Sequence, residues 1–126
     1  MAEKIKLVQG DTKPALVVSL TDEATGEPIG LNTATVRLYF RAVGSTTVLA
    51  TLVGTLLAGR VNTDGTVNSN APWNTPGAGG RVQFSWGPND LNQDQGDYEG
   101  EIEITFADST KQTVYDLLKF KLRQDF

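Results

Sequence analysis

The chain has 126 residues, with 11 lysines and arginines against 15 aspartates and glutamates and a formal net charge of −4. This length suits one domain that buries a core of its own, and we expect residues 1–126 to form a single domain. The negative balance argues against a dedicated nucleic-acid-binding protein, because such proteins carry clustered basic charge.

Two absent residue types restrict the chemistry of the chain. It contains no cysteine and no histidine. A disulfide framework and a thiolate metal site are therefore excluded. The commonest general base and the commonest metal ligand are also missing, which leaves carboxylates as the main candidates for acid–base work. We expect a non-enzymatic protein with no catalytic residues, no cofactor and no bound metal.

The first residues, Met1-Ala-Glu-Lys-Ile-Lys6, contain no apolar segment like that of a signal peptide. No apolar run in the chain is long enough to span a membrane. We therefore expect synthesis in the cytoplasm of the cell that makes the protein, no secretion by a signal peptide and no membrane partner.

Three segments of the first half alternate apolar and polar side chains, as half-buried strands do: residues 4–9, 15–21 and 34–42. A fourth strand segment, residues 47–57, is apolar and rich in threonine. Gly54 lies inside the last segment, so we expect that strand to bend or bulge. Turn formers separate the first three segments: residues 10–14 end in proline, and residues 21–28 predict a hairpin-type loop with Gly26 at positive φ.

The third segment places Arg37, Tyr39 and Arg41 on its outward side. Long charged side chains with an aromatic between them commonly cover a solvated sheet face. We interpret the row in that way, with a binding stripe as the alternative.

Residues 62–80 form a long polar connection with almost no side chain suited to a core. Such connections in compact domains are usually functional or disordered. Trp73 lies in the middle, either as an anchor at an interface, where tryptophan is enriched, or as a lid folded back on the end of the sandwich. We expect Gly77-Ala-Gly-Gly80 to provide flexibility before the next strand.

The second half begins with a strand over residues 81–86 and a turn over residues 87–90. Residues 94–106 then predict the strand around which the chain is organised. Its inward side carries Tyr98, Gly100, Ile102, Ile104 and Phe106, and its outward side carries Glu99, Glu101, Glu103 and Thr105. Asp94, Gly96 and Tyr98 match the start of strand F in immunoglobulin-like sandwiches, where a tyrosine hydroxyl bonds back to the backbone and fixes a corner.

Residues 107–110 predict a tight hairpin connection, and residues 111–123 predict the last strand, with Asp116 as a bulge. We interpret the three outward glutamates as an exposed charge ladder opposite Lys119 and Lys121. Their spacing also permits a carboxylate hydrolase, with Glu101 and Asp97 as the residues to test. Residues 62–65 and 94–97 contain oxygen ligands suited to calcium, but we interpret them as ordinary turns.

These patterns give seven strands and no amphipathic helix. They predict an all-β protein with the immunoglobulin-like antiparallel β-sandwich fold and Greek-key connections.

Several motifs, in order, resemble the N-terminal immunoglobulin-like domain of the phage baseplate upper protein family and related tail proteins. They are Gly10-Asp-Thr-Lys-Pro14, Thr21-Asp22, Gly26-Glu-Pro-Ile29, Leu31, Ala34-Thr-Val-Arg37, Trp86-Gly-Pro-Asn-Asp90-Leu91, Gly96-Asp-Tyr98, Glu101, Phe106-Ala-Asp108 and Thr113. The resemblance covers nearly the whole chain apart from residues 62–80. It implies a component of a tailed-phage virion that docks a receptor-binding or fibre module onto the tail or baseplate, usually in symmetric copies.

The expected partners are therefore other tail or baseplate proteins and further copies of the chain, made in the cytoplasm of the host bacterium. The exposed edge strands and the loop around Trp73 are the expected contact surfaces. Loop position and residue type select Trp73, Asn70, Asn74, Pro76 and Tyr39 as contact candidates. The alternative is a carbohydrate-binding or adhesin module, in which Trp73 and Tyr39 stack on sugar rings beside the two asparagine amides.

Overall fold

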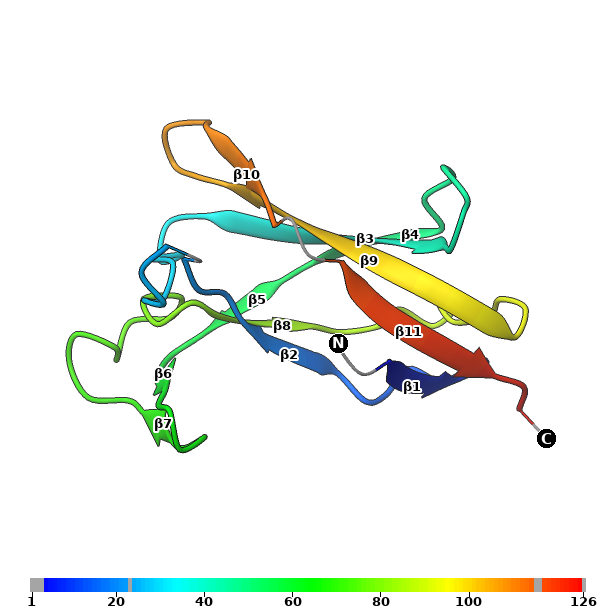
Figure 1. The fold of residues 1–126 in the computed structure, drawn as a ribbon, viewed down its shortest axis with the longest axis horizontal. Coiled ribbons are helices and arrows are strands. Elements are labelled where there is room, and N and C mark those ends of the chain that lie inside the picture. Colours follow the sequence, from blue (N-terminus) through cyan, green and yellow to red (C-terminus); the bar gives the residue numbers. More distant parts are fainter. Residues whose placement is uncertain (1–3, 23, 115–116, 126) are drawn as a thin grey trace.

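The computed structural model describes residues 4–22, 24–114 and 117–125, and the chain is built from strands and turns (Figure 1). Within these residues there is no helix, and therefore none long and apolar enough to cross a membrane. The strands form curled sheets that pack as a sandwich. The predicted all-β class is confirmed.

The larger sheet holds the strand around which the sequence is organised. Its order is β1 (Ile5–Val8), β11 (Leu118–Arg123), β9 (Gly96–Thr105), β3 (Thr35–Ala42) and β4 (Ala50–Val53), and β10 (Lys111–Thr113) also pairs with β9. The β1–β11 pair is parallel, and the other pairs are antiparallel. The strand β9 therefore lies in the interior of the sheet, between β11 and β3.

The smaller sheet has the order β2 (Leu16–Ser19), β8 (Arg81–Phe84) and β5 (Thr55–Leu57), all antiparallel. A separate hairpin of β6 (Arg60–Val61) and β7 (Val67–Asn68) follows β5. In Figure 1 this hairpin lies at the end of the molecule opposite the C-terminus.

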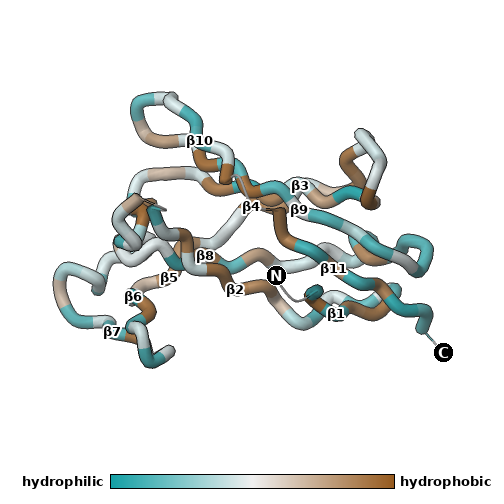
Figure 2. The backbone as a smooth tube through the Cα atoms, in the orientation of Figure 1, coloured by the Kyte–Doolittle hydropathy of each residue, from teal (hydrophilic) through white to brown (hydrophobic). Residues whose placement is uncertain are grey.

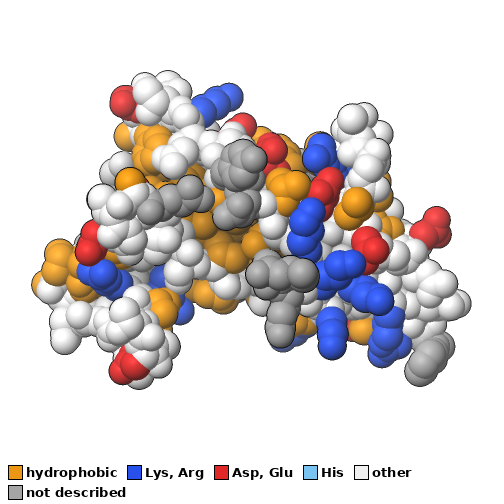
Figure 3. Space-filling model, viewed as in Figure 1, with side chains coloured by type: hydrophobic (Ala, Val, Ile, Leu, Met, Phe, Trp, Pro, Cys, Tyr) orange, Lys and Arg blue, Asp and Glu red, His pale blue; other side chains and the backbone are white. Residues whose placement is uncertain are grey.

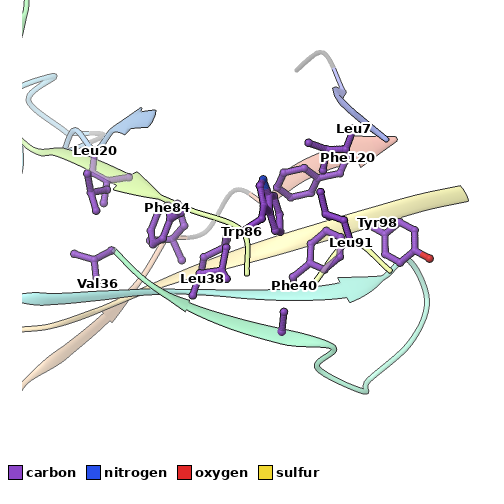
Figure 4. Packing of buried hydrophobic residues seen from close by; sticks show 14 of the residues in the cluster. Leu7, Leu20, Val36, Leu38, Phe40, Phe84, Trp86, Leu91, Tyr98 and Phe120 are labelled. Carbon is purple, nitrogen blue, oxygen red and sulfur yellow. The ribbon is translucent and has the colours of Figure 1, made fainter. Parts of the chain in front are cut away.

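The core lies between the two sheets and is richest in aromatic side chains near β3 and β9 (Figure 4). Phe40 is fully buried at its centre. Its ring centroid lies 5.1 Å from those of Trp86 and Tyr98 and 5.4 Å from that of Phe120. Such stacked and edge-on pairs add to the stabilisation from burial alone. Without a disulfide, this packing joins the sheets.

Gly100 lies on the inward side of β9, where antibody domains often have a cysteine. A Cβ added there would lie 2.7 Å from Leu38 Cδ1 and 3.0 Å from Phe120 Cε2. The two neighbouring side chains therefore fill the space that a side chain at position 100 would need.

The expected bend at Gly54 is present. The backbone pairs with β3 before this residue, as β4, and with β8 after it, as β5. A Cβ at Gly54 would lie 2.3 Å from Val82 Cγ2, so only glycine lets the chain pass this close to the core. The segment therefore leaves one sheet and enters the other at this point.

The prediction of a single strand over residues 111–123 is wrong. The segment contains β10 and β11, which pair with successive parts of β9: Thr113 lies opposite Glu103, and Leu118 lies opposite Gly100. The bulge expected at Asp116 lies outside the described residues. Side chains alternate in β11, where Phe120 and Leu122 are buried and Lys121 between them is exposed.

Residues 62–80, which the sequence left open as functional or disordered, are partly structured, and the flexibility expected at residues 77–80 is not what their packing shows. The segment contains β7, and its last glycines are buried where backbones meet. A Cβ at Gly79 would lie 2.0 Å from the carbonyl oxygen of Gly59. A Cβ at Gly77 would lie 2.9 Å from the carbonyl carbon of Leu31. These glycines permit close packing, which the pattern of the sequence alone does not distinguish from flexibility.

Candidate contact surfaces

The predicted corner at the start of β9 has its expected hydrogen bond. The Tyr98 hydroxyl donates to the backbone carbonyl of Asp94, while the Tyr98 ring stacks on Phe40. Gly96 between them has φ +150°, a conformation suited to glycine. Burial, and secondarily the charge of Asp94, raises the pKa of Tyr98 above its ordinary value. The corner ties the β8–β9 connection to the aromatic core.

Tyr98→Phe should lower the free energy of unfolding at pH 7 by about 1 kcal/mol, because it removes this hydrogen bond and keeps the ring. The raised pKa of Tyr98 also gives stability that is complete below about pH 10, the unfolded value, and is lost as the pH rises through the folded pKa. Urea unfolding at pH 7 and at alkaline pH measures both effects.

The matched control for this prediction is Tyr39→Phe. Burial and the Glu103 carboxylate also raise the pKa of Tyr39, but its hydroxyl belongs to the outer sheet face and not to the corner. Tyr98→Phe should therefore cost more than Tyr39→Phe at pH 7. Equal stability of the Tyr98 variant and the parent at pH 7 would show that the corner bond contributes nothing.

Trp73 is held against β6 and is half-buried. Its backbone N–H donates to Asn70, and its carbonyl accepts from Gly59, both at 2.7 Å. The guanidinium carbon of Arg60 lies 5.1 Å from the centroid of the indole ring, a cation–π contact. Arg60 also pairs with Glu27 at 3.1 Å. The arginine therefore occupies one face of the ring that a sugar would use.

The structure places the other contact candidates in two separate regions. Asn70, Asn74 and Pro76 are exposed on the same segment as Trp73. Tyr39 belongs to β3 in the larger sheet, where its hydroxyl donates to Glu103 at 3.2 Å. The structure therefore does not bring Tyr39 and Trp73 together, as stacking on one sugar would require.

The outer face of the larger sheet carries only part of the predicted charge ladder. Glu99 lies opposite Lys119, but Lys121 lies opposite Asp97, and Glu101 and Glu103 lie opposite Tyr39 and Arg37. Glu99 bridges Arg41 at 3.0 Å and Lys119 at 3.3 Å, across both neighbouring strands. These side chains cover it so well that the residue is only 7% exposed, whereas the sequence predicts an exposed glutamate. Glu101 remains exposed and lines an open pocket with Tyr39, Arg41 and Val48.

Asp97, one of the two carboxylates named for a hydrolase, lies in an ion pair with Lys4. A general acid needs a pKa that is raised toward the working pH. The hydrogen bond from Lys4, at 2.9 Å, instead lowers the pKa of Asp97. This direction suits a surface ion pair.

The loop considered for calcium forms a turn of its own. The Asp64 carboxylate accepts hydrogen bonds from the Thr66 N–H and hydroxyl, which lower the pKa of Asp64. Asn62 also donates to the Thr66 hydroxyl at 3.1 Å. Throughout the described ranges, no group of three or more acidic side chains is placed to hold a metal ion.

The sequence interpretation missed one surface, on the side of the sandwich formed by β4 and β5. Val43, Val48, Leu49 and Val53 are large apolar side chains that remain exposed there. The signal was present in the sequence: residues 42–59 contain no aspartate, glutamate, lysine or arginine. The sequence analysis interpreted residues 47–57 as a strand with a bend and expected contacts at exposed edge strands, but it did not identify which strands form the edges.

Comparison with known proteins gives no independent assignment. Neither a scan against protein-family models nor a search of curated proteins found a match to this chain.

Proposed function

We propose that the chain is a non-enzymatic structural component of a bacteriophage virion. It belongs to the tail, the baseplate or the region that attaches fibres, and it acts through contacts with other virion proteins and with its own copies. The proposal extends the resemblance found in the sequence, using the positions of its motifs in the fold.

The observation that carries the proposal is that several motifs of the resemblance form turns of the sandwich. Gly10 and Gly26 adopt φ +77° and +73°. The Gly87 N–H donates to the Asp90 carboxylate at 2.6 Å, which closes the turn after β8. Tyr98 closes the next corner. The motif residues therefore have the structural roles that a shared fold would require.

The strand order supports an immunoglobulin-like, Greek-key assignment as part of the same proposal. In such domains strands B, E and D share one sheet, and strands C, F and G share the other. The sets β2, β8, β5 and β3, β9, β11 follow these two groupings, and β4 lies beside β3 as strand C′ does in variable-type domains. A rigid sandwich with exposed edges suits a repeated structural subunit.

The direct test is quantitative mass spectrometry of tailed particles purified on a density gradient from cells that make the protein. We expect peptides of this chain in the particle fraction, in a fixed ratio to the other structural proteins at every stage of purification. A chain that stays with the soluble proteins, or whose ratio falls with each step, would contradict a role in the virion.

A further inference from the structure

One side of the sandwich ends in a single continuous segment. Residues 50–53 form the edge of the larger sheet as β4, and residues 55–57 form the edge of the smaller sheet as β5. Gly54 joins them, and its N–H donates to the Val36 carbonyl at 2.8 Å. The two edge strands therefore follow one another along the same side of the molecule.

This edge lacks two of the features that protect exposed strands from pairing, namely charged side chains and proline. Natural edges carry charged residues, especially lysine, or proline. Residues 42–59 contain neither, whereas β1, the other edge of the larger sheet, carries Lys6. Lysine and arginine side chains gather over β1 and β11 in Figure 3. The connection from β1 to β2 adds Asp11, Lys13 and Pro14. The β1 side of the sandwich therefore carries charged side chains and a proline, and the β4–β5 side carries neither.

Exposed apolar side chains lie on the uncharged side of the sandwich, at β4 and the connection that leads to it. Among the described residues, four of the seven large exposed hydrophobic residues lie in β4 or in the connection that leads to it: Val43, Val48, Leu49 and Val53. Val53 is 61% exposed and Val43 is 52% exposed. Figure 2 shows brown, hydrophobic backbone in the connection between β3 and β4. Exposed apolar surface beside an open strand edge is typical of a surface that a protein partner covers.

The backbone of β4 is oriented for such pairing. Its side chains alternate, with Ala50 and Leu52 buried and Thr51 and Val53 exposed. The N–H groups of an antiparallel strand point alternately to its two sides. Because the Gly54 N–H points to β3, the N–H groups of Thr51 and Val53 point to the open side.

We propose that β4 pairs with β4 of a second copy of the chain, antiparallel across a two-fold axis, and so joins the larger sheets of two copies into one. The absence of charge selects a second copy as the occupant. A two-fold contact brings each surface against its own copy, so a charged edge would meet its own charge. The β4 edge meets only threonine, leucine, valine and alanine. This inference rests on the proposed role as a repeated subunit.

The test is the mass in solution, measured by light scattering over a concentration series, for the parent chain and Val53→Glu. Val53 lies opposite Arg37, so a glutamate there faces an opposite charge within its own chain and leaves the fold intact. In the dimer, two glutamates meet near the axis. We expect the parent mass to approach twice the monomer mass, and the variant to raise the dissociation constant at least about tenfold.

Three further variants complete the design. Val53→Thr keeps an uncharged β-branched side chain and should dimerise like the parent. Lys6→Glu changes the charge of the opposite edge and should also dimerise. Thr51→Glu is the second disruptive variant and should weaken the dimer as Val53→Glu does. Thermal unfolding monitored by circular dichroism identifies any variant that fails to fold.

Three results would overturn the inference. They are a parent that stays monomeric at every concentration, a dimer that both glutamate variants leave unchanged, and a parent monomer whose β4 edge instead binds a strand of another virion protein. The proposed function is tested separately. A monomer present in purified particles would refute the pairing alone, and a dimer absent from particles would refute the virion role alone.

Discussion

Gly80→Ala is expected to lower the free energy of unfolding by about 3–5 kcal/mol, which for a small domain approaches complete loss of folding. Gly80 has φ +77°, and a Cβ there would lie 2.4 Å from the Leu20 carbonyl oxygen. That oxygen accepts a hydrogen bond from Ile29, and the Leu20 N–H donates to Gly80 at 2.8 Å. The contact therefore cannot relax without breaking backbone hydrogen bonds that position β2.

The matched control is Gly10→Ala. Gly10 also has φ +77°, but no atom lies within 4 Å of its added Cβ. This variant measures the left-handed conformation alone, about 1–2 kcal/mol. Urea unfolding followed by tryptophan fluorescence compares the two. Equal losses would show that close packing at Gly80 adds nothing, and that residues 77–80 tolerate the movement their glycines suggest.

Phe40→Ala is the second large effect, with an expected loss of about 3–5 kcal/mol. Phe40 is fully buried and contacts three aromatic rings: Trp86, Tyr98 and Phe120. Its removal leaves a cavity bordered by both sheets, and rings held in stacked and edge-on positions cannot easily fill it. The loss of the Trp86 contact should also reduce the near-ultraviolet circular dichroism of the folded protein.

Two controls separate the volume of Phe40 from general sensitivity to substitution. Phe40→Leu keeps an apolar side chain in the core and should cost clearly less than the alanine variant. Val43→Ala removes an exposed side chain and should change stability by no more than about 0.5 kcal/mol. A Phe40→Ala loss as small as that of Val43→Ala would contradict the placement of Phe40 at the centre of the core.

The strands that alternation predicts best are those in the middle of the larger sheet. In β3 the residues Val36, Leu38 and Phe40 are buried, and in β9 Ile102 and Ile104 are buried, as the period of two requires. A shift of one residue would turn either set toward water, so the pattern specifies the inward face strongly. The tyrosine corner was predictable because its motif acts within five residues.

In the part of the chain that the structure describes, the seven predicted strands become eleven, because distant segments pair in ways that the local pattern does not show. Residues 47–57 and 111–123 each divide into two strands, because their ends pair with different partners. The β6–β7 hairpin has two residues in each strand, too few for a period to be visible. The packing at Gly79 and Gly80 depends on which distant backbone segments lie beside them. The local sequence pattern does not show this.

The candidate contact surfaces also depend on contacts between distant residues, which the local sequence does not predict. Loop position selected Trp73, but only the structure shows that Arg60 covers one ring face and itself pairs with Glu27. Charge patterning predicted only part of the arrangement of charges on the outer face, and not the burial of Glu99, which depends on side chains from both neighbouring strands. The β4 edge emerged only when the uncharged segment was seen to lie at the end of the sheet.

Amide hydrogen exchange, measured by nuclear magnetic resonance at a low and a high protein concentration, tests most directly whether the chain acts through contacts between its copies. Pairing through β4 predicts that the Thr51 and Val53 amides exchange quickly in dilute solution and become protected in concentrated solution, while β1 at the opposite edge is unchanged. Exchange of Thr51 and Val53 that is the same at both concentrations would show that this edge stays open and would contradict the assembly described above.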